Sequence, residues 1–333
     1  MRGRADAFAT LAAVGLLVLT AAMLAGSVLA SQQIVVERGR AERSLGSQAA
    51  AWKTADTLLS ALQATWNPDE QTLDAWWAQH GAEYPDGSTL VSLSARVNLN
   101  TMTPFLLQDS ELAGTLKGKS VDEFTTYRLN NGPLSGMNDY KDYFAPEALN
   151  ALYCVYSSFN VNTADEIMLE RVVALRTGSD SFASNVRTKV REFRTNRKAM
   201  TAADLDMLVG AEKDPLGDLL TVEPELDVNT ASVEVLEAIL RDPDLNVTQP
   251  DAKLQAIVTG RSARPWTADA LRQALSVPAG SPILQYLGTR SRFLQAVIHG
   301  KTEDMKFVVV VQYSADSPPR ITLRVLHTEW DPV

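Results

Sequence analysis

The pattern of apolar and polar residues begins with a long uncharged segment. Residues 7–36 contain no charged side chain, and 7–30 are almost entirely apolar. A helix needs about 20 apolar residues to cross a bilayer, so this segment predicts one membrane span. From Ser47 to Trp66 apolar residues, Trp52 among them, recur at intervals of three and four. That spacing predicts an amphipathic helix beyond the span.

A cleaved secretory signal is the alternative for the first segment, because small residues surround Ala30. The apolar run is longer than the roughly 7 to 15 residues of a signal core, which favours a retained anchor. Arg2 and Arg4 precede the span and favour a cytoplasmic amino terminus with the remainder of the chain exported. The sequence therefore predicts a single-pass membrane protein.

The rest of the chain changes period twice. Apolar and polar residues alternate from Val91 to Val97, which predicts a strand, and helical spacing then dominates from Thr101 to Gln285. Strands flank the helices on both sides, which predicts an α+β fold with a helical domain inserted into a sheet. Helices are predicted over Ala164–Leu175, Val186–Lys198, Ala202–Val209, Ala231–Leu240, Ala252–Thr259 and Ala268–Leu275, and later strands over Arg292–His299, Phe307–Tyr313 and Ile321–His327.

Composition removes several classes of function. The 333 residues include one cysteine, Cys154, and three histidines, so a disulfide scaffold or a dense zinc module is excluded. The net charge of −9 argues against a general nucleic-acid binder, because affinity for polyanions comes largely from phosphate neutralisation. We found no nucleophile elbow, zinc-protease motif or phosphate-binding glycine loop, and the sequence predicts a protein that is not an enzyme.

One short pattern, an Asn or Asp two residues before an Asn-Thr pair, occurs three times. Each copy is interpreted as an extended entry into a helix, with the threonine as N-cap; Thr163 to Glu166 also fits a capping box. The residues of the pattern are Asn98, Asn100 and Thr101; Asn160, Asn162 and Thr163; and Asp227, Asn229 and Thr230.

The third copy raises the possibility of DNA binding. Residues 227–275 resemble the helix-hairpin-helix family in their opening and in Arg261. The segment between the helices, however, has no glycine and carries Asp242 and Asp244, which would repel phosphate. The resemblance of residues 227–275 to the helix-hairpin-helix family is therefore the single reason to keep a membrane-anchored DNA-uptake protein as an alternative.

Two further clusters have candidate binding roles. Arg187, Arg191, Arg194 and Lys198 fall on one face of a predicted helix, which is typical of a solvated face and would also suit an acidic protein neighbour. Separately, oxygen-bearing side chains follow the one-three-five spacing of a calcium loop, but the sixth position is not glycine, so only an irregular calcium site is considered. Those side chains are Asp242, Asp244 and Asn246.

The chain as a whole resembles a minor pseudopilin of the type II secretion system, the K subunit (general secretion pathway protein K). Met1-Arg2-Gly3 before the uncharged helix resembles the prepilin leader, and Phe8 stands where most pilins, but not K subunits, carry glutamate. The segments Leu73–Trp77, Val97–Asn100 and Ser291–Trp330 resemble family segments in the same order. The family's Asp-Glu-x-Gly run is absent before Asn98.

The resemblance implies a pseudopilin fold. Prepilin peptidase would cut between Gly3 and Arg4, leaving a long amino-terminal transmembrane helix followed by a small antiparallel sheet with a large all-α domain inserted in it. The implied parts are a leader at 1–3, a pilin helix at 4–66, the first part of the sheet at 67–100, the inserted helical domain at 101–286 and the terminal strands at 287–333.

The resemblance also implies a role. A K subunit sits in the bacterial inner membrane with its carboxyl-terminal domain in the periplasm, joins the I and J subunits at the tip of the pseudopilus, and helps initiate or limit assembly for protein export. Its implied partners are those subunits, the inner-membrane secretion platform and prepilin peptidase, and calcium is its possible ligand. A type IV pilus minor pilin is a second alternative, because it shares the amino-terminal helix.

Overall fold

The computed structural model describes residues 44–332 apart from short internal gaps. The predicted leader, Gly3, Arg4 and the uncharged segment at 7–36 lie outside the described residues. Among the described residues, no helix is both long and apolar enough to cross a bilayer. The gaps are at 109–110, 135, 197, 213–215, 218, 301–302 and 315–318.

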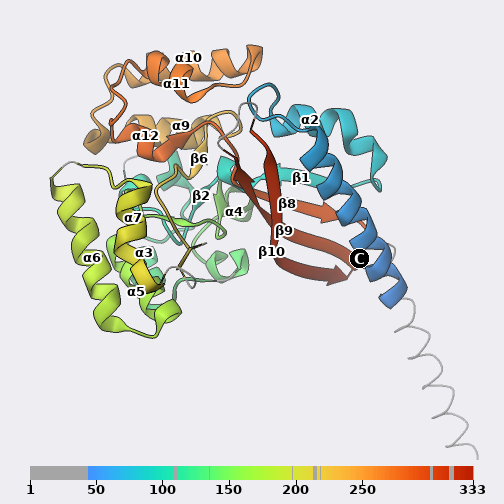
Figure 1. The fold of residues 1–333 in the computed structure, drawn as a ribbon, viewed down its shortest axis with the longest axis horizontal. Coiled ribbons are helices and arrows are strands. Elements are labelled where there is room, and N and C mark those ends of the chain that lie inside the picture. The colour runs from blue at the N-terminus through green and yellow to red at the C-terminus, as the bar shows by residue number, and fades with distance from the viewer. Residues whose placement is uncertain are drawn as a thin grey trace, which may run out of the picture.

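An antiparallel sheet of four strands forms one side of the molecule (Figure 1). The strands lie in the order β1-β8-β9-β10, so the first strand pairs with one that follows some two hundred residues later. The prediction of an α+β fold with an antiparallel sheet is confirmed. The strands are β1 (Thr89–Ser92), β8 (Phe293–Ile298), β9 (Glu303–Tyr313) and β10 (Ile321–Pro332).

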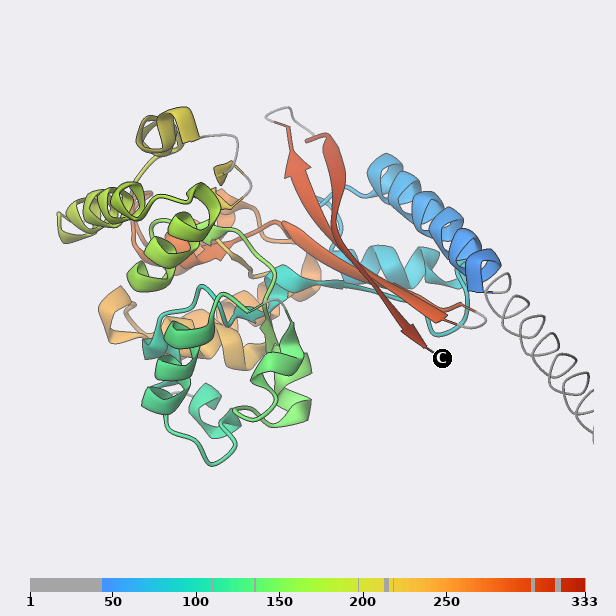
Figure 2. The same ribbon diagram turned by 90° about the horizontal axis from the view of Figure 1, so that it is seen from below.

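Two helices cover one face of this sheet. Residues 44–65 are helical, α2 (Leu73–His80) follows a short turn, and Figure 2 shows the first of these helices lying along the strands. Leu58 and Leu62 are completely buried against alternate residues of β9 such as Phe307. The amphipathic helix predicted over 47–66 is therefore confirmed. We refer to residues 44–92 and 293–332 as the sheet body.

Two sequence predictions in the sheet body were wrong. Trp52 is 45% exposed instead of belonging to the buried stripe. The strand predicted to run to Val97 ends at Ser92, and a 3₁₀ turn (Leu93–Ala95) follows. The reason is hydrogen bonding: the Ser94 hydroxyl is buried and accepts the N–H groups of Arg292 and Phe293, at 3.0 and 3.2 Å. From the alternating pattern we had expected the Ser94 side chain to face solvent.

Residues 93–292, here called the helical body, lie between β1 and β8 and are mostly helical (Figures 1 and 2). The bounds predicted for Ala202–Val209 and Ala268–Leu275 match the observed helices, and the other predicted helices are present with shifted ends. Its α-helices are α3 (Val121–Asn131), α4 (Pro146–Leu152), α5 (Glu166–Thr177), α6 (Asp180–Thr195), α7 (Ala202–Val209), α9 (Val233–Leu240), α10 (Pro250–Ala263), α11 (Ala268–Leu275) and α12 (Ile283–Tyr286).

Short 3₁₀ helices connect several of these elements. In the sheet body, residues Gly81–Glu83 extend α2. Those of the helical body are Leu93–Ala95, Pro104–Leu107, Glu111–Thr115, Met137–Tyr140, Gly210–Glu212 and Pro243–Leu245.

The helical body is not purely helical, because six two-residue strands pair within it. Each pair is parallel and joins an early strand to a later one. A strand of two residues is too short for an alternating pattern to reveal, so these pairs were not predicted. The pairs are β2 (Val97–Asn98) with β3 (Tyr153–Cys154), β4 (Phe159–Asn160) with β5 (Leu220–Thr221), and β6 (Leu226–Asp227) with β7 (Leu287–Gly288).

Candidate functional site

The three copies of the sequence pattern open three units of the same design. Each copy supplies the first strand of one parallel pair, and the second strand of that pair closes the unit shortly before the next copy begins. We call residues 97–154, 159–221 and 226–288 the first, second and third units. The first and third units share one apolar core, and the second has its own.

The first polar side chain of each copy shapes the turn after the strand. Its Oδ1 atom accepts the backbone N–H two residues later, and its backbone carbonyl accepts the N–H of the threonine. This geometry is an Asx turn, which Asn and Asp both support. The side-chain bonds are Asn98 to Asn100 (2.7 Å), Asn160 to Asn162 (2.9 Å) and Asp227 to Asn229 (3.0 Å).

The second asparagine of each copy holds a distant loop of its own unit. Its side-chain oxygen accepts the N–H of one loop residue, and its side-chain nitrogen donates to that residue's carbonyl. An amide is suited to this task because it carries both a donor and an acceptor. The held residues are Leu134 for Asn100, Met200 for Asn162 and Trp266 for Asn229.

One arginine of each unit completes the arrangement. Its guanidinium donates to two backbone carbonyls of the turn. One belongs to the residue between the two polar residues of the copy, and the other to the residue directly after the threonine. The three arginines with their acceptors are Arg128 with Leu99 and Met102, Arg194 with Val161 and Ala164, and Arg261 with Val228 and Ala231. We call the asparagine and arginine contacts of one unit its clamp.

The structure corrects four interpretations of the sequence. The helix of the second unit is capped by Asp165, whose carboxylate accepts two N–H groups, and that of the third by Ser232; the first copy leads into a 3₁₀ helix that begins after Thr103. Thr101, Thr163 and Thr230 are therefore not the caps. The turn extends beyond each threonine, so each helix starts two residues later than expected. Arg261, considered as a DNA contact, donates to carbonyls inside its own unit.

The cationic face of α6 is largely paired within the chain. Arg187 meets Glu170 at 2.6 Å, and Arg191 meets Glu166 at 2.9 Å, both from α5. Arg194 belongs to the second clamp. The expectation of a solvated face is confirmed for Arg191, whose side chain is 56% exposed, and is wrong for Arg194. Docking of an acidic neighbour stays a prediction, and Lys198 lies beyond the end of the helix.

The spacing that suggested calcium forms a turn. The Asp242 carboxylate accepts the Asp244 N–H at 2.8 Å and caps a 3₁₀ helix, after which Asn246 adopts a left-handed conformation. Asp251, further along, pairs with Arg241. Among the residues the structure describes, no group of three or more His, Cys, Asp or Glu side chains is arranged to hold a metal ion.

The three histidines lie in separate surroundings. None of their ring contacts joins one histidine to another. The contacts are His80 with Glu83 (3.2 Å), His299 with Asp304 (2.6 Å) and His327 stacked on Tyr156 (5.5 Å between ring centroids).

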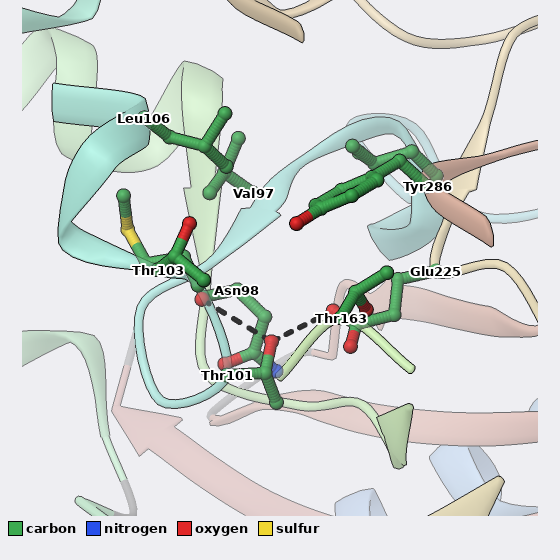
Figure 3. Close-up of a pocket in the computed structure, with 10 residues that line it drawn as sticks. Val97, Asn98, Thr101, Thr103, Leu106, Thr163, Glu225 and Tyr286 are labelled. Carbon is green, nitrogen blue, oxygen red and sulfur yellow. Dashed lines mark hydrogen bonds between the residues drawn. The ribbon is translucent and has the colours of Figure 1, made fainter. Parts of the chain in front are cut away.

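The units meet at a small cavity that sequence reasoning did not identify. Its volume is about 20 Å³, enough for one water molecule. Figure 3 shows Thr101 and Thr163 from the first two units lying close to Glu225, with Tyr286 of α12 on the far side. Val97, Met102, Leu106 and Leu226 also line it, so a few polar groups meet here within a largely apolar wall.

Glu225 is the charged group of this cavity. One carboxylate oxygen accepts the Thr101 hydroxyl at 2.7 Å, and the other faces the Asn160 N–H at 3.3 Å. Burial raises the pKa of Glu225 to about 7, against the lowering effect of these hydrogen bonds and of Arg292. Its position directly before the third copy was the available signal, but its partners are distant in sequence.

A larger cleft separates the third unit from the sheet body. Its volume is about 850 Å³, and Leu271, Leu287 and Val311 contribute apolar walls. Arg290 crosses it to Asp69 through two hydrogen bonds of 3.0 and 2.8 Å. This ion pair ties the turn after the first helix to the linker before β8.

No model of a known protein family matches the chain, and no curated protein matches it.

Proposed function

We propose that this chain is a non-enzymatic minor pseudopilin of the K type, at the tip of a type II secretion pseudopilus. Its amino-terminal segment would anchor it in the inner membrane and then pack against the helices of neighbouring subunits. The sheet body and helical body would lie in the periplasm. There the chain would start or limit assembly together with the I and J subunits.

The observation that carries this proposal is the way the helical body joins the sheet. Ser92 of β1 pairs with Leu294 of β8, so the helical body enters and leaves between two neighbouring strands. A helix at 44–65 packs on the same sheet and begins seven residues after the uncharged segment. The uncharged segment, a small sheet and an insertion between its strands follow the order that the resemblance implies.

The proposed role of the helical body is steric. It contains residues 93–292, far more than the sheet body, and Figure 2 shows it lying beyond the sheet on the side away from helix 44–65. A body of this size at the tip would leave no room for a further subunit to stack above it.

DNA uptake is not proposed. Arg261, the arginine that suggested it, donates to backbone carbonyls of its own clamp. The cations of α6 are also engaged: Arg194 belongs to a clamp, and Arg187 and Arg191 pair with carboxylates of α5. These contacts leave little positive charge on α6 for phosphate.

The test compares three strains of the source bacterium: one lacking the gene, one complemented with the full chain, and one complemented with a variant in which Asn-Gly replaces residues 93–293 and threonine replaces Val308 and Val310. We expect the deletion to abolish secretion of exported proteins, and the excised variant to give longer or misregulated pseudopili. Immunoblots of membrane fractions control for the amount of each chain. Normal secretion in the deletion strain would overturn the proposal.

The mature amino terminus provides an independent check. Mass spectrometry of the native protein should find a chain that begins at Arg4 and remains in the membrane fraction. A chain that begins at Ser31 and is released from membranes would contradict the anchor. Loss of surface pili or of DNA uptake in the deletion strain, with normal secretion, would favour the alternatives.

A further inference from the structure

Glu225 lies where all three units are joined. It lies in the short segment between β5 of the second unit and β6 of the third. Its carboxylate contacts Thr101 of the first unit and Asn160 of the second.

Other contacts join the units as well. Gln285 of α12 accepts the side-chain N–H groups of Asn160 and Asn162 at 2.9 and 3.0 Å, and Arg128 of the first unit donates to the Asp165 carboxylate of the second at 3.0 Å. Glu225 differs from both, because its carboxylate contacts two units from the start of the third.

The groups around Glu225 do not balance a negative charge. Arg292, from the linker before β8, is the cation that faces it; Tyr286 from α12 and Cys154 from β3 are neutral at ordinary pH. Glu223 faces Arg292 as well and shares its charge. Among the described residues, no lysine or arginine lies within 4.0 Å of the Glu225 carboxylate as an ion pair.

Arg292 is itself committed elsewhere. Its guanidinium donates to the Thr221 hydroxyl at 2.8 Å, on the wall of the large cleft. A carboxylate withdrawn from water and lacking a direct cation is destabilised relative to its acid form. The acid form keeps its hydrogen-bonding capacity, because its O–H can donate and its other oxygen can accept.

We propose that Glu225 is a proton-operated joint of the helical body: its carboxylic acid form holds the turns at Thr101 and Asn160 to the start of the third unit, and ionisation loosens that contact. Glu225 can have this role because it stands at the start of the third unit and its side chain contacts both other units.

The direction of the effect follows from the environment. Glu225 has a pKa of about 7 in the folded protein, above its ordinary value of 4.5. Its contribution to the closed state is therefore complete below pH 4.5 and is lost as the pH rises through 7. Between pH 6 and 8 opening of the joint should become about tenfold more frequent, if the carboxyl regains its ordinary pKa when the joint opens.

Hydrogen exchange of the full-length chain, measured by mass spectrometry, tests this joint. After correction for the intrinsic pH dependence of exchange, protection of the peptides around 97–103 and 159–164 should fall about tenfold between pH 6 and 8. Glu225→Gln mimics the acid form and should remove this dependence. The matched control, Glu147→Gln, changes an exposed carboxylate in the first turn of α4, apart from the groups that face Glu225 and Arg292, and should behave like the unchanged chain.

A titration of the unchanged protein keeps the test independent of how the variants fold. The carboxyl carbon resonance of Glu225 should titrate with a midpoint near pH 7. A midpoint below 5, protection that does not change with pH, or the same dependence in Glu225→Gln would each overturn the proposal.

Discussion

The asparagine that directly precedes the threonine of each copy could not be replaced by another residue type without loss of a hydrogen bond. It must give a hydrogen-bond acceptor to one N–H and a donor to a carbonyl of the same loop residue. Aspartate lacks the donor and serine is too short to span both groups. In the third unit Asn229 also donates to the Thr289 carbonyl at 2.9 Å, so one side chain serves three backbone groups.

Asn229→Ala should destabilise the protein by about 3 kcal/mol, because buried backbone groups would lose their partners. Urea unfolding followed by circular dichroism measures this change. Asn131→Ala is the control: that side chain is exposed and bonds only to Tyr127 one turn earlier, so its loss should cost less than about 0.5 kcal/mol. Equal effects of the two substitutions would count against the clamp.

Cys154 should resist thiol reagents in the folded protein. It is 3% exposed, and burial raises the pKa of its thiol to about 12, so the reactive thiolate is scarce at pH 8. An aromatic disulfide reagent should label the native chain only as fast as it unfolds, and the urea-unfolded chain within minutes. Rapid labelling of the native protein would contradict this burial.

At this scale the sequence revealed the pattern but not its contacts. Three similar segments were visible because they are local, and their threonines were assigned as caps from local rules. The partners of the asparagines and arginines lie some thirty residues away, and those of Glu225 farther still. No local periodicity encodes such contacts, so Arg128 and Glu225 were missed as functional groups and Arg194 was assigned to a cationic helix face.

Among the elements, the helix at 44–65 shows how one face is chosen. Leu58 and Leu62 are buried against the sheet, whereas Leu45 is 65% exposed near the first described turn. Trp52 has the correct spacing for the buried stripe but lies on the outer side. Spacings of three and four allow a stripe about 100° wide, and residues at its margin are not assigned by the pattern.

Leu62→Ala should lower the free energy of unfolding by about 3 kcal/mol, because it leaves a cavity between the helix and β9. Leu45→Ala removes the same atoms from an exposed position and should change it by less than about 0.5 kcal/mol. Thermal unfolding of both variants is the measurement. A small effect of Leu62→Ala would mean that the helix does not rest on the sheet.

The most accurate element predictions were those with strong boundary signals. The side chains of Thr201 and Thr267 cap α7 and α11, and Gly210 follows α7, so their limits could be located from sequence. The paired strands of the units are only two residues long. A period of two cannot be detected over that length, and only the tertiary contacts define these strands.

For the whole molecule, the pairing of Ser92 with Leu294 means that the chain leaves the sheet body and returns to it at one place. The core beneath helix 44–65 draws on residues from 51–90 and 294–321 alone. The opposite face of the sheet is different, because Val308 and Val310 pack against Leu93 and Cys154. Removing the helical body would leave these valines exposed.

Residues 44–332 with Asn-Gly in place of 93–293 should therefore fold as a small α+β protein once Val308 and Val310 are changed to threonine. The two-residue turn fits the antiparallel register of β1 and β8. Cooperative thermal unfolding and dispersed NMR spectra would support this expectation. The version that keeps both valines should aggregate more readily, and an unfolded threonine version would show that the helical body is needed for folding.

Because each unit ends with one strand just before the next unit begins with another, the fold also limits where insertions and deletions can arise during evolution. Residues inserted or deleted inside one unit leave the strands of the other two in place. A change in the short segments from β3 to β4 or from β5 to β6 would displace the unit that follows. Homologous sequences should accordingly vary in length within the units and stay constant across those two junctions.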